Sequence, residues 1–554
     1  MKNPCKHISY LMLCPIRSSL YLYLFLLNVI SNFADIVYDK SQFAIFSMVM
    51  LAALSAYVES FVYKLLRDRW PRIIWLFIVV VWHNILLIID YFLVYQFQMA
   101  IGQDAIDILA ETNPVEIENF LEAYISWKTI AICLSCLLMI NVGLIWLTRK
   151  LLKLPYIWPA AIFTCIGLGI LFVCIYNFAI YRNGMSIPQY QTNTRLGYSV
   201  FVMYQRFQKI TMLEDVCRNI KAFSEQNPKP TIVVVIGESF TVYHSSLMGY
   251  EKPTNPLLQK RVDDGSLQVF DNAVSIACGT HGAMLSIFSL DSLGVGFERL
   301  PLFPACFKAA GWQTYMYDNQ YFVGSGVNFL ADAELSAIMF DKRNTNRVSF
   351  DMEMIETITP KNVPSLYVIH LWGQHYTYSE RYPKDFQYFK ASDYNSARWT
   401  ERQREIIAHY DNATRYNDYV LDQIICRFEK QNSCVIYLSD HGEEIYELSD
   451  YLGHGNAEHR KDMSYQVRVP FMIWTSPSFS PPDIKEMIKE SRHLPIMTDD
   501  VSHLLLDIAG IRCDGFRPTR SVINPKYNKK KPRIVLNSID YDKRTQFGSS
   551  KGQQ

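Results

Sequence analysis

Most of the long apolar segments of this 554-residue chain lie within its first 181 residues, and this uneven distribution limits the folds that it can adopt. A helix that crosses a bilayer needs about 20 mostly apolar residues. Five segments meet or approach that length, over residues 18–32, 44–63, 73–97, 129–147 and 157–180. The first could be a signal-peptide core, but its central Asn28 and the lack of a small-residue cleavage site favour an uncleaved helix. We predict a five-helix transmembrane domain over residues 1–181.

Loop charges predict the orientation of this domain, because basic residues mark the cytoplasmic ends of membrane helices. Basic residues precede the first segment and fill the loops after the second and fourth segments: Lys2, Lys6, Arg17, Lys64, Arg67, Arg69, Arg72, Arg149, Lys150 and Lys153. The alternate loops are acidic, over residues 35–39 and 104–122. We therefore expect a cytoplasmic amino terminus and an extracytoplasmic chain after Tyr181.

The remaining composition excludes one class of function and leaves the cysteines open. A formal net charge of +1 gives no support for nucleic-acid binding, and we exclude that class. Six cysteines would lie in an oxidising compartment: Cys217, Cys278, Cys306, Cys426, Cys434 and Cys513. Disulfides and isolated thiols in apolar packing are both consistent with this pattern.

The second half of the chain alternates strand-like and helical stretches, which is typical of an α/β fold. Residues 182–227 read as a connector with interfacial helices, and 526–554 as a basic, polar tail. The strand-like runs are 231–236, 314–317, 365–370, 434–439 and 469–474; the helical stretches are 300–310, 402–430 and 499–509. We predict an α/β sandwich over residues 228–525, with a central, mostly parallel sheet and helices on both faces.

Two of the predicted strands end at residues that bind metals. Glu238 follows the run that ends at Gly237, and Asp440 and His441 follow the run that ends at Ser439. Open α/β sheets place their sites at the carboxyl ends of strands, and two carboxylates with an imidazole suit a zinc-like ion. Taken alone, Glu238 could be a helix N-terminal acid and the Asp-His pair a simple hydrogen-bonded pair.

A candidate nucleophile, Thr280, stands in Cys278-Gly279-Thr280-His281-Gly282, directly before an apolar helix. A hydroxyl at a helix N-terminus faces backbone donors that favour phosphate, and coordination to zinc would lower its pKa. The structural alternative is a helix-capping threonine.

Two further histidines stand in glycine-containing loops. His375 occurs in Gly373-Gln374-His375-Tyr376, and His454 in Leu452-Gly453-His454-Gly455. Each could be a second metal ligand, a phosphate donor or a general acid, whereas a solvated loop histidine is the structural alternative. Weaker candidates are His244, His281 and His459.

The order of these motifs resembles the alkaline-phosphatase and sulfatase superfamily. Within it, the chain is similar to the membrane-bound phosphoethanolamine transferases that modify lipopolysaccharide, which include the lipid A enzymes of polymyxin resistance. Further matching segments are Met248–Glu251, Thr254–Leu258, Tyr410–Asn412, Asp418–Val420 and Arg468–Phe471. The five apolar segments match as well, so the resemblance covers nearly the whole chain.

The resemblance implies specific roles for the candidate residues. Four residues match the family's zinc ligands: Glu238, Thr280, Asp440 and His441. Thr280 also matches the nucleophile, while His375 and His454 match histidines that bind the substrate phosphate or a second zinc. In the acidic loop, Thr112 and Glu116 match the segment that binds the phosphoethanolamine headgroup, although a capped interfacial helix is the alternative there.

The implied reaction moves phosphoethanolamine from phosphatidylethanolamine to lipid A or core lipopolysaccharide through a phosphoethanolamine-threonine intermediate. It implies Zn²⁺ as cofactor, a multi-pass protein of the bacterial inner membrane with a periplasmic catalytic domain, and a monomer. Two alternatives stay open: phosphoglycerol transfer from phosphatidylglycerol, and a membrane binding protein on a decayed enzyme fold. A sulfatase is disfavoured because the chain has no Cys-x-Pro-x-Arg motif.

The chain departs from the family pattern at three places. Ile108 replaces a polar Asn four residues before Thr112, and His281-Gly282 replaces the usual residues after Thr280. A shift of register would put Gly282 at the nucleophile position and remove the hydroxyl, but the length of the segment from Asn272 favours Thr280. The segment 318–320 lacks the family's Lys and disulfide loop, so the acceptor subsite is the least transferable part.

Overall fold

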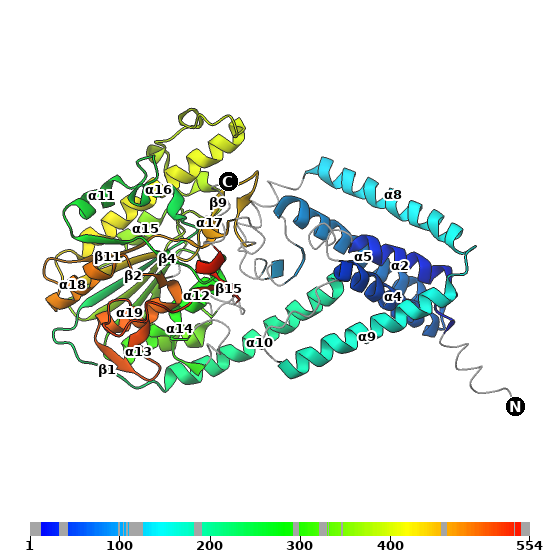
Figure 1. Ribbon diagram of the computed structural model, residues 1–554, viewed down its shortest axis with the longest axis horizontal. Helices are drawn as coiled ribbons and strands as arrows, with labels where there is room; N and C mark the ends of the chain where they lie inside the picture. Colours follow the sequence, from blue (N-terminus) through cyan, green and yellow to red (C-terminus); the bar gives the residue numbers. More distant parts are fainter. Residues whose placement is uncertain are drawn as a thin grey trace. The chain divides into compact units, whose positions relative to one another are not determined.

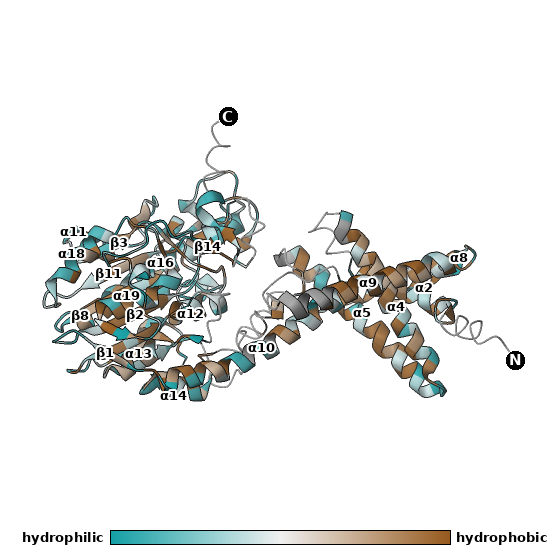
Figure 2. Cartoon of the chain, turned by 60° about the horizontal axis from the view of Figure 1, so that its bottom comes forward, coloured by the Kyte–Doolittle hydropathy of each residue, from teal (hydrophilic) through white to brown (hydrophobic). Residues whose placement is uncertain are grey.

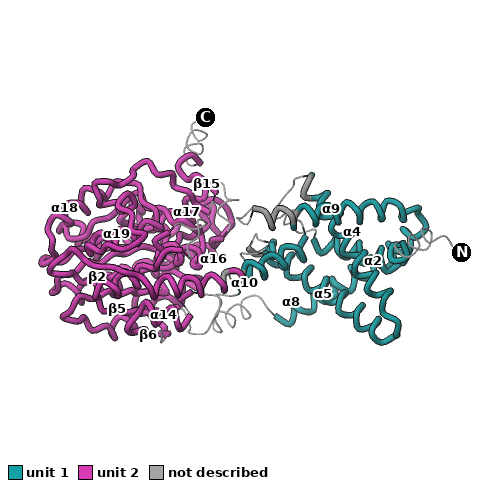
Figure 3. The backbone as a smooth tube through the Cα atoms, turned by 90° about the horizontal axis from the view of Figure 1, so that it is seen from below, with its two compact units in different colours: residues 1–204 teal, residues 205–554 magenta. Residues whose placement is uncertain are grey.

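The computed structural model divides into two compact units, residues 1–204 and 205–554 (Figure 3). It describes residues 13–32, 42–97, 100–102, 105–106, 109, 126–181, 191–291, 299–320, 329–330, 332–344, 347–455, 462–536 and 538–544. The domain boundaries predicted at residues 181, 227 and 525 stay predictions.

The first unit contains one helix for each predicted apolar segment. These are α2 (Ser19–Ser31), α4 (Gln42–Leu65), α5 (Arg69–Phe97), α8 (Trp127–Leu151) and α9 (Ile157–Tyr181). Among the described residues, three stretches are long and apolar enough to cross a membrane, namely Ile45–Leu65, Arg69–Tyr95 and Trp127–Leu151, whereas Ser19–Ser31 and Ile157–Val173 are shorter. Hydrophobic colouring dominates these helices (Figure 2). The prediction of apolar N-terminal helices is confirmed.

Several buried polar side chains of the first unit are paired with one another. His83 Nε2 lies 2.7 Å from Glu59 Oε1, and Asn28 Nδ2 lies 3.2 Å from the same ring nitrogen. Asp90 accepts from Arg195 Nη2 at 3.0 Å, which joins α5 to α10 (Thr192–Arg218). Such pairing is expected because unpaired polar groups are costly within a bilayer.

A seven-stranded mixed sheet forms the centre of the second unit, with the strand order β3-β11-β8-β2-β7-β5-β6. Its strands are β2 (Thr231–Gly237), β3 (Leu267–Phe270), β5 (Gln313–Asp318), β6 (Lys342–Asn344), β7 (Ser365–His370), β8 (Ser433–Ser439) and β11 (Phe471–Thr475). Strands β8, β2, β7, β5 and β6 are parallel, while β11 pairs antiparallel with both β3 and β8. The predicted central, mostly parallel sheet is confirmed.

Helices cover both faces of this sheet, because its central strand is apolar on both sides. Ile232, Val234 and Ile236 of β2 belong to a core shared with α12, α13 and α19, whereas Val233 and Val235 belong to a core shared with α11, α15 and α16. Figure 1 shows these two groups of helices on opposite sides of the sheet. Their bounds are α11 (Pro256–Asp263), α12 (Thr280–Phe288), α13 (Phe303–Ala309), α15 (Asp351–Glu356), α16 (Glu401–Phe428) and α19 (Val501–Ile508).

Candidate active site

Strand pairing brings the two predicted ligand segments together. Gly237 of β2 lies opposite Ser439 of β8, so the residues that follow each strand are neighbours. The Asp440 N–H donates to the Gly237 carbonyl oxygen at 3.1 Å, and the Ser239 N–H donates to Asp440 Oδ1 at 3.1 Å. Glu238 and Asp440 are both fully buried. Two carboxylates therefore lie side by side at the carboxyl edge of the sheet.

The Thr280 hydroxyl lies beside these carboxylates. Thr280 begins α12, and its Oγ1 lies 3.2 Å from Glu238 Oε2 and 3.4 Å from His441 Nε2. The N-cap of the helix is Gly279, without a side-chain cap, so Thr280 does not have the capping role that its sequence position allowed. Because residue 282 is a glycine, Thr280 is the residue that presents a hydroxyl here.

His441 presents one ring nitrogen to the cluster. Its Nδ1 lies 2.9 Å from the Gly442 carbonyl oxygen, which makes Nδ1 the donor and leaves the Nε2 lone pair for a ligand. Nε2 lies 3.2 Å from Glu238 Oε1 and 3.4 Å from Asp440 Oδ2. Asp440 Oδ2 is buried and has no hydrogen-bond partner.

These separations suit a tetrahedral metal ion. A zinc ion with ligand bonds of about 2.0–2.1 Å holds its ligand atoms about 3.3 Å apart, and the four oxygen and nitrogen contacts described above range from 3.2 to 3.4 Å. Glu238, Asp440 and His441 together satisfy the spacing of a metal-binding group. The buried, unbonded Asp440 oxygen also needs a partner of positive charge. The residues present therefore fit zinc.

Burial and mutual charge perturb the whole cluster. Burial raises the pKa of Asp440 to about 7, and the Glu238 carboxylate reinforces this. The pKa of Glu238 lies well below its usual value despite burial, because positive charge at His441, and then at His375 and His454, favours the carboxylate. Burial opposes protonation of His441, yet Asp440 and Glu238 raise its pKa to about 10. The cluster thus favours a positive charge at its centre.

A second group of ligand-type residues adjoins the first. His454 Nδ1 lies 2.6 Å from Glu443 Oε2, and the rings of His454 and His441 lie 4.1 Å apart. Glu443 Oε1 accepts from the buried Tyr378 hydroxyl at 2.8 Å. His441, Glu443 and His454 also satisfy the spacing of a metal-binding group. Glu443 was not among the residues singled out from the sequence, although an acid two residues after His441 was a visible signal.

His375 lies in the loop after β7, which packs directly on Glu238. The Gln374 N–H donates to the Glu238 carbonyl oxygen at 3.0 Å, and Gly373 has a left-handed backbone (φ +49°). A Cβ atom at Gly373 would lie 2.9 Å from the Glu238 nitrogen, so only glycine permits this approach. The half-buried His375 is near enough to lower the pKa of Glu238, as described above.

Gln320 supplies a further contact that the sequence did not indicate. Its Nε2 donates to Glu238 Oε2 at 3.2 Å and to the Leu371 carbonyl oxygen at 2.6 Å. It follows β5, so a neutral amide stands beside the Glu238 carboxylate here. The Ser239 hydroxyl donates to the other oxygen, Glu238 Oε1, at 2.8 Å.

The carboxyl-terminal segment holds the loop that leads to Thr280. The Leu536 N–H donates to the Ile276 carbonyl oxygen at 2.9 Å, and Arg533 Nη1 donates to Asn272 Oδ1 at 2.7 Å. Val535 and Tyr541 share an apolar cluster with Ile276 and Cys278. The basic, polar composition of this tail predicted no role for it.

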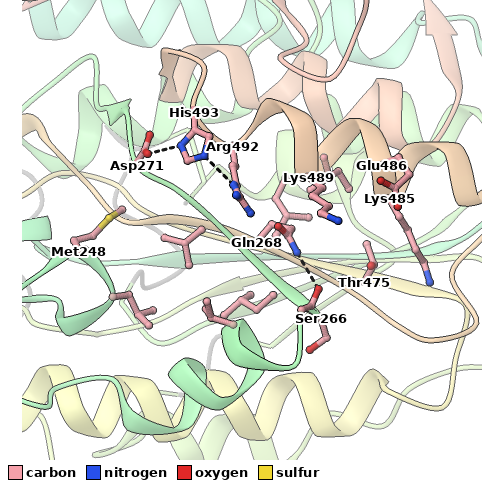
Figure 4. A pocket seen from close by; sticks show the side chains of 17 residues that line it. Met248, Ser266, Gln268, Asp271, Thr475, Lys485, Glu486, Lys489, Arg492 and His493 are labelled. Atoms are coloured by element: carbon pink, nitrogen blue, oxygen red, sulfur yellow. Dashed lines mark hydrogen bonds and ion pairs between the residues drawn. The ribbon is translucent and has the colours of Figure 1, made fainter.

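The other candidates lie outside this cluster or outside the described residues. His244 pairs with Asp411 at 2.5 Å. His281 is the second residue of α12. Thr112, Glu116 and His459 lie outside the described residues, and the headgroup segment stays a prediction. A separate cavity of about 490 Å³ opens at the edge strand β3, with Lys485 and Lys489 on its rim (Figure 4), and none of its lining residues belongs to the cluster.

Comparison with known proteins places the second unit in a family. The sulfatase family model matches residues 230–511, just over half of the chain. Phosphoethanolamine transferase EptC of Escherichia coli (strain K12) is 26% identical over 507 residues, which cover 84% of this chain and 85% of that protein. Phosphoethanolamine transferase EptA of Helicobacter pylori is 29% identical over 288 residues, which cover 50% of this chain and 53% of that protein.

Solved structures agree with both units. The C-terminal periplasmic domain of EptC from Escherichia coli has a TM-score of 0.52 at 26% identity and covers 58% of this chain and 95% of that one. The same domain has been solved in complex with Zn, with a TM-score of 0.50, 26% identity and coverage of 58% and 96%. The integral membrane protein EptA from Neisseria meningitidis has a TM-score of 0.58 at 17% identity, covers 93% of this chain and 98% of that one, and so shares the fold. The chain therefore belongs to the sulfatase family and is a homologue of the phosphoethanolamine transferases.

Proposed function

We propose that the chain is a zinc-dependent phosphoethanolamine transferase of the bacterial inner membrane, with its catalytic unit in the periplasm. The observation that carries this proposal is the Thr280 hydroxyl, which lies 3.2 to 3.4 Å from buried ligand-type groups at the N-terminus of α12. The named activities of the relatives support it. They include the Kdo(2)-lipid A phosphoethanolamine 7''-transferase of Escherichia coli (strain K12), which is 26% identical over 279 residues.

Zinc would be held by four residues: Glu238, Thr280, Asp440 and His441. When bound, it supplies Lewis-acid charge that lowers the pKa of the threonine hydroxyl and offsets negative charge on the phosphoryl group.

The nucleophile in our scheme is Thr280 Oγ1. It attacks the phosphorus of phosphatidylethanolamine, the phosphorus–oxygen bond to diacylglycerol breaks, and a phosphoethanolamine-threonine ester remains. The backbone N–H groups at the N-terminus of α12, which begins at Thr280, can bind the phosphoryl oxygens. An acceptor oxygen on lipid A or core lipopolysaccharide then attacks the same phosphorus and releases Thr280.

In our scheme His454 moves the protons of both steps. With Nδ1 held by Glu443 at 2.6 Å, its Nε2 is the atom that protonates the departing diacylglycerol oxygen. In the second step the same nitrogen takes the proton of the attacking acceptor hydroxyl. His375, from the loop that packs on Glu238, binds a phosphoryl oxygen in this scheme.

The apolar helices serve the reaction because donor and acceptor are both lipids. A site held at the bilayer surface raises the effective concentration of both substrates. We assign Thr112 and Glu116 to binding of the donor headgroup. We also propose that the amino terminus lies in the cytoplasm, and we expect a monomer to be active.

The test of the nucleophile uses the purified full-length protein in detergent with phosphatidylethanolamine and lipid A. We expect Thr280→Ala to lower transfer by about a thousandfold or more, because the reacting oxygen is gone. Thr280→Ser keeps a hydroxyl and serves as the matched control. Transfer by Thr280→Ala at a near wild-type rate would refute the assignment.

Three further measurements separate the alternatives. Phosphatidylethanolamine and phosphatidylglycerol supplied separately identify the donor, since release of glycerol phosphate would favour phosphoglycerol transfer. Absence of zinc from protein purified without chelator would favour a decayed binding protein. Mass spectrometry of lipid A and core oligosaccharide, with and without the gene, shows which one gains phosphoethanolamine.

A further inference from the structure

Two cysteines that are distant in sequence meet in the core of the second unit, away from the active site. Cys306 Sγ lies 3.7 Å from Cys513 Sγ, although the residues are 207 positions apart. Cys306 is fully buried, whereas Cys513 is partly exposed. A third cysteine, Cys217, lies nearby, and its Sγ accepts from the Leu302 N–H at 3.4 Å.

The elements that carry these cysteines come from three parts of the chain. Cys306 lies on α13, whose N-cap is Leu302. Cys513 ends β13 (Ile511–Cys513), which pairs antiparallel with β1 (Ala222–Ser224), so that Ala222 lies opposite Cys513. A bond between the two sulfurs would therefore tie α13 to the two-stranded sheet of β1 and β13.

A covalent bond explains the arrangement better than a metal site or two separate thiols. Neither of the two groups with metal-binding spacing, among the residues that the structure describes, contains a cysteine. A disulfide needs a sulfur separation of about 2.05 Å. The two sulfurs already lie 3.7 Å apart, so a bond requires them to approach by about 1.6 Å.

We propose that Cys306 and Cys513 are a modification site, which a periplasmic protein disulfide donor oxidises to a structural disulfide. The inference rests on the proposed periplasmic location of the second unit, because disulfides persist in oxidising compartments and are rare in the cytosol. It concerns a cross-link outside the catalytic cluster and assigns no catalytic role to either cysteine.

The chemistry balances as a thiol–disulfide exchange. The Cys513 thiolate attacks one sulfur of the donor disulfide, forms a mixed disulfide and releases one donor thiolate. The Cys306 sulfur then loses its proton and attacks the Cys513 sulfur, which releases the second donor thiolate. The two cysteines lose two electrons and two protons, and the donor gains them as two thiols.

The order of attack follows from the environments of the two sulfurs. Burial raises the pKa of Cys306, whereas contact with Cys306 lowers the pKa of Cys513. Cys513 is also the more exposed of the two residues, so a large protein donor reaches it first.

The test uses the full-length protein expressed in cells with an active periplasmic oxidation system. Free thiols are alkylated with N-ethylmaleimide at lysis, and the protein is digested without reductant. We expect one linked peptide pair containing Cys306 and Cys513, which disappears on reduction and is absent from Cys306→Ser and Cys513→Ser. The matched controls Cys217→Ser and Cys434→Ser keep it. Alkylated Cys306 and Cys513 in the wild-type protein, or a bond from either one to Cys217, would overturn the proposal.

A second experiment, in vitro, shows why the cross-link is absent if the first experiment does not detect it. Reduced, purified protein is treated with oxidised glutathione and analysed in the same way. If the cross-link forms only in this arm, the geometry is right and the proposed periplasmic location is wrong. If it forms in neither arm, the two sulfurs do not approach as the structure shows. Neither result depends on transferase activity, so failure of the proposed catalytic function is seen separately.

Stability gives an independent readout. Either serine substitution breaks the same bond, so Cys306→Ser, Cys513→Ser and the double variant should lower the melting temperature by equal amounts. Additive losses in the double variant would indicate two separate thiols and contradict the disulfide.

Discussion

Gly373→Ala should damage the active site although it replaces no side chain of the cluster. Gly373 has φ +49°, and a Cβ atom there would lie 2.9 Å from the Glu238 nitrogen and 3.1 Å from the Glu238 oxygen. Ordinary contact begins at 3.4 Å. Relief of the clash therefore needs a displacement of about 0.5 Å at the backbone that carries Glu238. A displacement of about 1 Å costs roughly a hundredfold in rate, and this smaller displacement should cost less.

The expected effect is a fall of about tenfold in kcat/KM, with a loss of about 1–2 kcal/mol in unfolding free energy from the left-handed backbone. Gly265→Ala is the matched control, because Gly265 also has a positive φ (+80°) but nothing within 4 Å of the added Cβ. It should lose similar stability and keep its activity. The assay is the rate of diacylglycerol release from phosphatidylethanolamine, together with thermal unfolding. Equal activity of the two variants would refute the reasoning.

Three other substitutions test separate parts of the account. Glu443→Gln removes the charge that holds His454, so kcat should fall by about 10–100-fold, and wild-type turnover would contradict the proposed role. Arg533→Ala removes the contact with Asn272 in the loop before the nucleophile, so turnover should fall. The control Lys543→Ala, on the exposed surface of the same tail, should have no effect. Equal rates of the two variants would show that Arg533 does not position this loop. Burial opposes protonation of His244, yet Asp411 raises the pKa of His244 to about 10. The resulting stabilisation is complete below about pH 6.5 and is lost as pH rises through about 10. The His244→Gln variant should therefore lose less stability than the wild type between these pH limits, as measured by thermal unfolding. An equal dependence of stability on pH in both proteins would contradict the assignment.

The parts that the sequence predicted well depend on local pattern. The apolar runs that became β2 and β8 are continuous because both faces of each strand are covered, and each ends at a polar residue. Because parallel strands end at the same edge of a sheet, the residues that follow these two strands could be predicted to lie close together. The Gly237–Ser439 register is the physical reason that this prediction succeeded.

The parts that the sequence did not predict depend on contacts between distant segments. Glu443 meets His454 because β9 (Glu444–Ile445) pairs with β10 (Leu452–Gly453), a two-residue ladder with no periodicity to detect. Arg533 reaches Asn272 across 261 positions in the chain. Gln320 follows β5, which ends beside β7, and β7 in turn ends beside β2, so Gln320 reaches Glu238 across two strands. Glu443 itself was visible two residues after His441, but no local pattern in the sequence indicates which distant residue each of these groups would meet.

Anomalous X-ray diffraction at the zinc edge, from crystals of the full-length protein grown with zinc, tests the central claim most directly. The account predicts a strong anomalous peak within bonding distance of Thr280 Oγ1 and of the side chains of Glu238, Asp440 and His441. A zinc peak elsewhere, or one at the three other ligands with the Thr280 oxygen beyond bonding distance, would contradict the account.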